Sequence, residues 1–185
     1  MDKSIVRIRY GIHGRECIAT QFIPKNTIII QEKPFFLHKA RKEPFSKAIK
    51  KSIDIVPKVM HLAPEIQKQI RITKDNIDQY LDLLEKKYHT NRFEYTDDLS
   101  CLVYYGSYLN HSCCPNVKYK RVKNKLVFYT ICDVDKGDEL TISYINTQND
   151  YNVRAHMLKD WDIVCTCIKC IVEQTVKTNV NTYFY

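Results

Sequence analysis

Three closely spaced cysteines near the C-terminus have the spacing of a metal site. Cys165, Cys167 and Cys170 form a C-x-C-x-x-C pattern, which is too compact for three independent core residues. A structural Zn²⁺ takes four ligands in a tetrahedron, so this knuckle would supply three of them. The fourth ligand must come from elsewhere, and the candidates are the other five cysteines: Cys17, Cys101, Cys113, Cys114 and Cys132.

The segment YLNHSCCPNV, residues 108–117, is the favoured source of that fourth ligand. Cys113 lies there close to a proline, whose ring fixes the chain direction. We therefore expect one Zn²⁺ to join the knuckle to this segment through Cys113, with Cys114 as a bystander. The alternative is a set of reduced thiols that bind no metal. Asn110 and His111 would either contact a ligand or only satisfy the local backbone.

The composition indicates a folded intracellular protein. The 185 residues, 44% hydrophobic and 27% charged, fit one globular domain with an appendage. The N-terminus has charges where a signal peptide needs an apolar stretch, and no apolar run reaches the roughly 20 residues of a membrane span. We expect no membrane partner and a nuclear or cytoplasmic location, in the host nucleus if the source is viral. Thiols stay reduced there.

A basic block lies between Lys33 and Lys58, with eight Lys or Arg residues against Glu43 and Asp54. Such charge can steer a protein to nucleic acid or to another acidic surface. The same block can also be the solvated face of a helix, and it lacks the regular aromatic residues on which bases stack. Nucleic-acid contact through residues 33–58 is one hypothesis, with a zinc-dependent nucleic-acid binder as the corresponding function.

The elements that must position these residues are strands around a helical middle. Apolar patterns predict strands over 4–10, in the second half of 11–20, over 26–32 and over 139–144, and a hairpin that turns at Lys123-Asn124. Helices are expected in residues 35–99: one that Pro57 stops, one with Pro64 at its first position, and one over 73–88 capped by Thr73. A short helix over 153–161 precedes the cysteine knuckle and a polar tail.

Four segments, which follow one another along the chain in the order of the family, resemble motifs of the SET-domain lysine methyltransferases. NHSCCPN resembles the N-H-S-C-x-P-N signature, and GDELTISY resembles the G-E-E-L-T-I-x-Y strand. CTCIKC resembles the post-SET cysteine knuckle, and GIHGRECIAT resembles the N-terminal G-x-G turn. Within this family the chain looks most like the SET-and-MYND subgroup, because it has R-x-x-x-L before the cysteines and NRF at 91–93. The MYND zinc finger is missing, because no cysteine lies between Pro34 and Ser100.

The resemblance implies a fold and a role for each of several residues. The fold would be mainly β with a helical insertion, as small curved sheets around a pseudoknot: a SET domain over 1–164, an insertion over about 35–99, and a post-SET knuckle and tail over 165–185. Tyr144 would be catalytic and also contact the cofactor, S-adenosylmethionine. The other implied site residues are Gly14, Arg15, Asn110, His111 and Trp161 for the cofactor, and Cys113, Cys165, Cys167 and Cys170 for one structural Zn²⁺.

The implied activity is methyl transfer from S-adenosylmethionine to a lysine side chain of a protein, with a histone tail as the commonest substrate class. An aromatic channel would lower the pKa of the lysine by desolvation, and Tyr144 would align the amine. One residue departs from the family pattern: Glu16 stands where the second Gly of G-x-G is usual, and its carboxylate would crowd the cofactor. The alternative is therefore a catalytically inactive SET-like interaction module.

Overall fold

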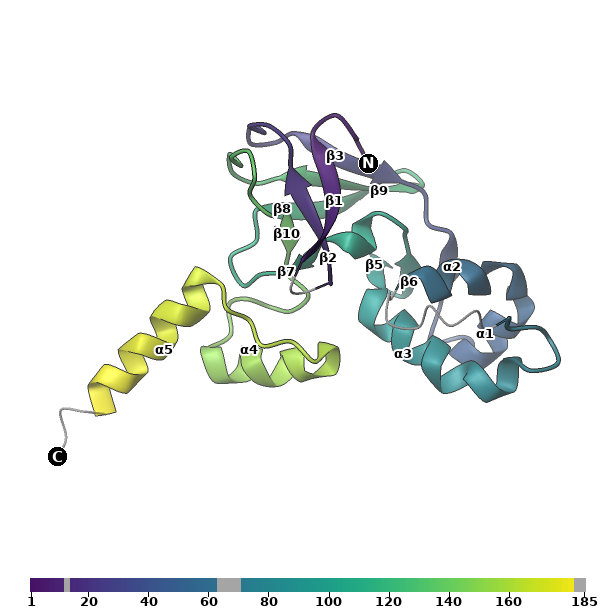
Figure 1. Cartoon of the computed structure of the whole chain (residues 1–185). Coiled ribbons are helices and arrows are strands. Elements are labelled where there is room, and N and C mark those ends of the chain that lie inside the picture. Colours follow the sequence, from purple (N-terminus) through teal and green to yellow (C-terminus); the bar gives the residue numbers. More distant parts are fainter. Residues whose placement is uncertain (12–13, 63–70, 182–185) are drawn as a thin grey trace. The chain divides into compact units, whose positions relative to one another are not determined.

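The computed structural model describes residues 1–11, 14–62 and 71–181, with side chains up to residue 176 (Figure 1). The chain forms two compact units. We call the first the helical unit; it comprises residues 1–2, 28–108 and 119–128. We call the second the cysteine unit; it comprises residues 3–27, 109–118 and 129–185. Every residue predicted to bind the cofactor or the metal falls in the cysteine unit.

Short paired strands form the frame of the cysteine unit. β1 (Val6–Gly11) and β2 (Gly14–Ala19) make an antiparallel hairpin whose register pairs Gly11 with Gly14. β7 (Asn110–His111) pairs in parallel with β10 (Thr141–Ile142). β10 is shorter than the predicted strand over 139–144. Before it, the Leu140 N–H donates to the backbone carbonyl of Cys17 in β2 at 2.7 Å, whereas within and after it two N–H groups donate to side chains. The Thr141 N–H donates to Asn116 Oδ1 at 2.8 Å, and the Tyr144 N–H donates to the His111 ring at 3.0 Å.

Two helices of the cysteine unit follow the strands. α4 (Tyr151–Met157) is capped by Asp150, whose carboxylate accepts from the N–H groups of Asn152 and Val153. The 3-10 helix η4 (Leu158–Trp161) continues it, so the short helix predicted over 153–161 is confirmed. The stretch expected as a polar tail is helical, as α5 (Ile168–Asn181). It contains neither Gly nor Pro, the two residues that most disfavour a helix interior.

The helical unit holds two three-stranded sheets, which confirms the prediction of small sheets. One has the order β3-β9-β8, with part of β8 and β9 in the cysteine unit, and the other has the order β4-β6-β5. The hairpin of β8 and β9 turns at Lys123, as predicted, and Lys123 has a left-handed φ of 55°. The bounds are β3 (Ile28–Glu32), β4 (Phe36–His38), β5 (Phe93–Thr96), β6 (Leu99–Leu102), β8 (Val117–Val122) and β9 (Lys125–Thr130).

The helices of this unit differ in detail from the predicted ones. Pro57 does not stop the first helix, which ends at Lys51, but lies in the first turn of α2, where a proline costs little. The predicted position of Pro64 lies outside the described residues. The bounds are α1 (Phe45–Lys51), η1 (Ile53–Ile55), α2 (Val56–His61), η2 (Ile77–Tyr80), α3 (Leu81–Asn91) and η3 (Gly106–Tyr108).

The predicted helix over 73–88 starts late because a side chain competes for the backbone. Asn76 Oδ1 accepts from the N–H of Thr73 at 2.7 Å, and its amide donates to the Arg71 carbonyl at 3.1 Å. Helical structure therefore begins at Ile77, and Thr73 does not cap it. The apolar stripe that predicts this helix consists of Ile77, Leu81, Leu84 and Tyr88. All four face the core of the helical unit, where Leu81 is partly buried and the other three are buried.

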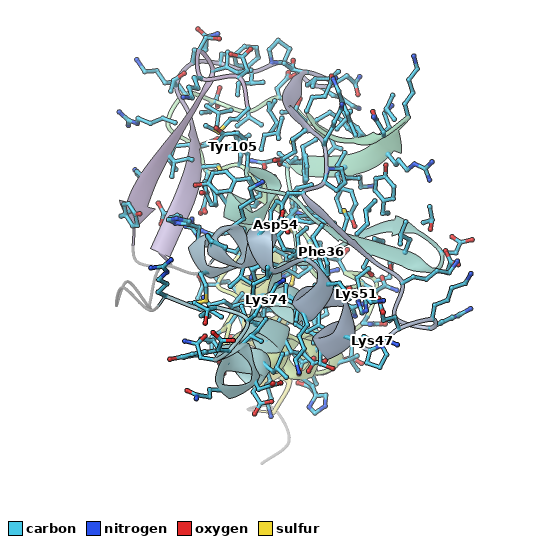
Figure 2. All side chains as sticks on the ribbon, turned by 90° about the vertical axis from the view of Figure 1, so that its right-hand side faces the viewer. Phe36, Lys47, Lys51, Asp54, Lys74 and Tyr105 are labelled. Carbon is cyan, nitrogen blue, oxygen red and sulfur yellow. The ribbon has the colours of Figure 1, made fainter. Side chains whose placement is uncertain are left out.

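The basic block folds into the helical unit with several of its cations paired. Lys51, labelled with Lys47 in Figure 2, belongs to α1. Within the described residues, Lys39, Lys50 and Lys51 form ion pairs with Asp98, Asp78 and Glu43 respectively. Pairing lowers the positive charge that these side chains offer to a phosphate backbone. None of the described helices is both long and apolar enough to cross a bilayer.

Glu32 at the end of β3 ties down the chain that leads to η3. Its carboxylate accepts from the N–H groups of Tyr104, Tyr105 and Gly106, at 2.9, 3.0 and 2.7 Å. We expect Glu32→Ala to lower the free energy of unfolding by about 3 kcal/mol, because three backbone donors lose a charged acceptor. Urea denaturation measures this. The exposed neighbour supplies the control, Gln31→Ala, and an unchanged midpoint for Glu32→Ala would contradict the assignment.

Candidate functional site

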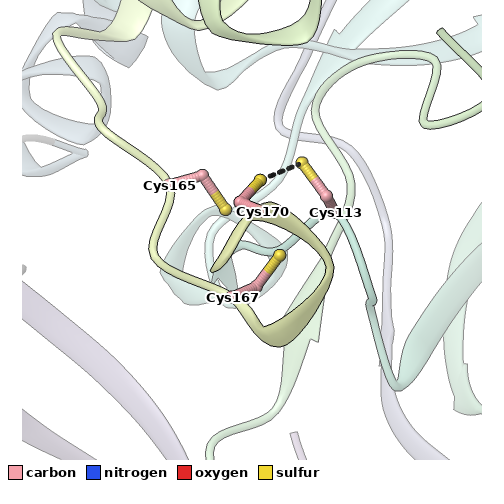
Figure 3. A group of neighbouring side chains, drawn as sticks. All are labelled: Cys113, Cys165, Cys167 and Cys170. Carbon is pink, nitrogen blue, oxygen red and sulfur yellow. Dashed lines mark hydrogen bonds between the residues drawn. The ribbon is translucent and has the colours of Figure 1, made fainter. Parts of the chain in front are cut away.

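Four cysteine sulfurs meet in the cysteine unit (Figure 3). Cys113 follows β7, whereas Cys165, Cys167 and Cys170 lie around the start of α5, and the four Sγ atoms are all within 4.8 Å of one another. The Cys113 and Cys170 sulfurs are 3.6 Å apart. A tetrahedral site with Zn–S bonds of about 2.3 Å has sulfurs separated by roughly 3.8 Å. The residues present therefore fit one four-coordinate Zn²⁺, and these are the four cysteines predicted as ligands.

The environment of the sulfurs differs from one to the next. Cys113 and Cys170 are buried, Cys165 and Cys167 are half-buried, and Cys114 is exposed. Burial raises the pKa of the Cys170 thiol to about 11. Burial also opposes ionisation of Cys167, but hydrogen bonds from the Cys170 backbone and the Cys165 side chain lower its pKa to about 6. A bound metal ion favours the thiolate form of all four.

A buried arginine lies against the sulfurs. Arg154 in α4 is 1% exposed, and its guanidinium donates from Nε to Cys113 Sγ at 3.3 Å and from Nη2 to Cys170 Sγ at 3.6 Å. The same group donates to Glu173 Oε2 at 2.9 Å and to the Asn149 carbonyl at 2.6 Å. The sequence pointed to Arg154 only as part of the R-x-x-x-L pattern, without a role.

His111 connects the sulfurs to Tyr144. Its Nδ1 accepts the backbone N–H of Tyr144 at 3.0 Å, so the ring proton must sit on Nε2, which lies 3.3 Å from Cys113 Sγ. Burial, and then the nearby charge of Arg154, lower the pKa of His111 to about 4, so the ring is neutral at physiological pH. Both ring nitrogens are thus committed within the cysteine unit.

Tyr144 is held among aromatic rings. Its hydroxyl donates to the Leu109 carbonyl at 2.8 Å. Its ring centroid lies 5.3 Å from that of His111 and 5.6 Å from that of Trp161. Burial raises the pKa of Tyr144 above its ordinary value, so the hydroxyl keeps its proton at physiological pH. The structure thus brings together three residues that the sequence assigned to one site.

Asn110 links β7 to the hairpin. Its amide donates to the Arg15 carbonyl at 2.9 Å and to Glu139 Oε1 at 2.8 Å. Both amide hydrogens are then committed, and the polar atom that remains is the acceptor Oδ1. Gly14, next to Arg15, has a φ of +87°, a conformation that glycine adopts without strain. The sequence reading missed Glu139, although its acidic position in GDELTISY was visible.

Glu16 is folded onto its own hairpin. The carboxylate is buried and accepts from Arg9 Nε at 2.8 Å, across from it in β1. A Cβ atom on Gly11 would lie 1.9 Å from Glu16 Oε1, so the absence of a side chain at Gly11 makes room for the carboxylate. The negative charge of Glu16 is therefore met by a cation of the same hairpin.

The comparisons with known proteins agree on one family. The profile of the SET domain matches residues 14–145. A protein of Acanthamoeba polyphaga mimivirus, named for an inferred SET domain, is 27% identical across 92% of this chain and 78% of its own length. A SET and MYND domain-containing protein of Dictyostelium discoideum is 44% identical over 80 residues, and a histone-lysine N-methyltransferase of Arabidopsis thaliana is 37% identical over 73 residues.

The cellular relatives match over short segments. The Dictyostelium match covers 41% of this chain and the Arabidopsis match covers 37%, and each spans 15% of the relative's length. A crystal structure from Plasmodium falciparum, described as a candidate histone methyltransferase, covers 76% of this chain and 93% of its own at 18% identity. Its TM-score is 0.42, and it carries no part of the assignment. Because the profile matches most of its length, this chain belongs to the SET-domain family and has the SET-domain fold.

Proposed function

We propose that this protein is a protein-lysine N-methyltransferase that uses S-adenosylmethionine and is stabilised by one structural Zn²⁺. The observation that carries the proposal is the anchored Tyr144, whose backbone and ring contact His111 and whose ring lies beside Trp161. Family membership supports it, as do the relatives named as histone-lysine N-methyltransferases.

The cofactor contacts that we propose take account of the hydrogen bonds that Asn110 and His111 already make within the protein. Asn110 Oδ1 is an acceptor suited to the ammonium group of S-adenosylmethionine. Gly14, Arg15 and His111 would contribute main-chain groups, because the His111 ring is committed to Tyr144 and Cys113. Trp161 and Tyr144 would give the methyl donor an aromatic wall. When bound, S-adenosylmethionine supplies an electrophilic methyl group.

The chain's own task is to present a neutral amine in line with that methyl group. A free lysine has a pKa near 10.4 and is charged at neutral pH. An aromatic surrounding removes water from the ammonium and lowers its pKa, so that bulk water can accept the proton. The Tyr144 hydroxyl, protonated and held by the Leu109 carbonyl, can then orient the amine through its lone pairs.

The substrate class and the subgroup are further parts of the proposal. We propose a histone tail as the substrate and a nuclear place of work, because several relatives are named as histone-lysine N-methyltransferases. The 44% identity to a SET and MYND domain-containing protein supports the SET-and-MYND subgroup. Between Pro34 and Ser100 the chain has no cysteine with which to build a MYND finger.

A methyl-transfer assay tests the activity directly. Zinc-loaded protein is incubated with S-adenosylmethionine labelled in its methyl group and with core histones or a cell lysate. We expect label on lysine residues of a protein, identified by mass spectrometry. A zinc-loaded protein that binds no S-adenosylmethionine in calorimetry and transfers no label would instead favour the inactive module.

Glu16 is the feature that favours the inactive module, and its pairing gives a test of that alternative. Because the carboxylate is bound to Arg9 within the hairpin, we expect Glu16→Ala to change the calorimetric Kd for S-adenosylmethionine less than about twofold, or roughly 0.4 kcal/mol. Arg9→Ala is the matched partner variant, since it leaves the carboxylate without its cation. A large gain in affinity for Glu16→Ala would show that the carboxylate obstructs the donor.

A further inference from the structure

We propose that Arg154 is a positioning residue of the metal centre, which holds two of the four sulfurs in place and offsets the charge of the zinc thiolate cluster. This inference rests on the proposed zinc site. Arg154 comes from α4, outside both cysteine segments, and it is the largest fully buried side chain among the described residues. A guanidinium in that position requires acceptors that carry negative charge.

The contacts of the guanidinium divide between the two cysteine segments. Nε points at Cys113, from the segment after β7, and Nη2 points at Cys170, from the first turn of α5. Hydrogen bonds from a charged donor to a charged acceptor are the stronger kind. One rigid planar group thus spans a pair of sulfurs that are 3.6 Å apart and 57 residues apart in sequence.

Charge balance gives Arg154 a second effect. Four thiolates around one Zn²⁺ carry a net charge of about −2. Two of the sulfurs are buried, so water screens that charge poorly, and a permanent cation in contact with them lowers the cost of forming all four thiolates. The His111 ring adds a second donor to Cys113.

Two further contacts fix the direction of the guanidinium. The Asn149 carbonyl accepts from Nη1, and Glu173 of α5 accepts from Nη2. Glu173 is about one-third exposed, so water screens its charge more than that of the buried sulfurs. Lys169 also lies 4.0 Å from Glu173 and shares its charge. Outer contacts of this kind keep metal ligands in place.

The test compares Arg154→Leu, Arg154→Lys and the control Lys159→Leu, which removes an exposed cation five residues away in η4. Zinc affinity is measured on the whole chain by competition with a chelator of known affinity. We expect Arg154→Leu to bind Zn²⁺ roughly 10- to 100-fold more weakly. Arg154→Lys keeps the positive charge but not the forked guanidinium, so its zinc affinity should fall less. Lys159→Leu should match the wild type.

Cobalt substitution gives a readout that general destabilisation does not produce. N–H donors lower the energy of sulfur lone pairs, so loss of Arg154 should move the sulfur-to-cobalt charge-transfer band to longer wavelength, while Lys159→Leu should leave it in place. If Arg154→Leu does not fold, Arg154→Lys carries both measurements. Wild-type affinity and an unshifted band in the Arg154 variants would overturn the inference alone. A wild-type chain that takes up neither zinc nor cobalt would overturn the metal site as well.

Discussion

Replacing Cys113 by serine is expected to abolish stoichiometric zinc binding and to lower the free energy of unfolding by several kcal/mol. Cys113 is the one member of the cluster that lies outside residues 165–170, so it makes the link between the two parts of the chain. A serine hydroxyl does not ionise at neutral pH and is a poor ligand. Because the binding energy of a structural zinc is also folding energy, losing a ligand costs stability directly.

The consequences of this substitution extend beyond the metal. Arg154 Nε and His111 Nε2 both point at the Cys113 sulfur and would lose that acceptor. His111 also accepts the backbone N–H of Tyr144, so a displaced ring would loosen the proposed catalytic tyrosine. We therefore expect the affinity for S-adenosylmethionine to fall together with the zinc content.

The neighbouring residue offers a close control for Cys113→Ser. Cys114 is exposed and lies outside the cluster, so Cys114→Ser should keep one zinc per chain and an unchanged midpoint. Zinc is measured by elemental analysis after gel filtration, and stability by urea denaturation with and without a chelator. A Cys113→Ser protein with a full zinc complement and wild-type stability would rule out the predicted ligand set.

Local sequence patterns predicted the features of the fold and of the site that depend only on the spacing of neighbouring residues. The C-x-C-x-x-C knuckle places three sulfurs within six residues whatever the rest of the fold does. The turn at Lys123-Asn124 needs only a residue that tolerates positive φ between two strand-forming runs, and Lys123 has a φ of 55°. The family motifs then supported Cys113 as the fourth ligand and pointed to Tyr144, a connection to the knuckle that local spacing alone could not make.

The residues that sequence reading missed act through contacts between distant segments. Arg154 entered the sequence analysis only as part of the R-x-x-x-L pattern, and its role becomes visible when the fold places sulfurs from two segments around it. Glu16 looked like an obstacle to the cofactor, because the approach of its carboxylate to Arg9 and Gly11 is visible only once β1 and β2 are paired. The helix predicted from residue 73 begins only at Ile77 because the Asn76 side chain competes for the backbone. The spacing of apolar residues gives no sign of such a side-chain hydrogen bond.

Replacing Tyr144 by phenylalanine is expected to reduce methyl transfer at least about 100-fold while leaving donor affinity nearly unchanged. The substitution removes only the hydroxyl, so the ring keeps its positions beside His111 and Trp161. The amine loses the group proposed to orient it, and a misplacement of about 1 Å can cost a factor of 100 in rate. The Leu109 carbonyl loses a donor, which should cost about 1 kcal/mol of stability.

Rate and binding must be measured separately for this prediction. Initial rates at saturating S-adenosylmethionine report the transfer step, and calorimetry reports donor affinity. Tyr151→Phe is the matched control, because Tyr151 lies in the same unit and its hydroxyl accepts a hydrogen bond from the exposed side chain of Gln174. A Tyr144→Phe protein that transfers methyl groups at the wild-type rate would remove this hydroxyl from the mechanism. Loss of donor binding in the same variant would instead show that the Tyr144 hydroxyl contributes to donor binding.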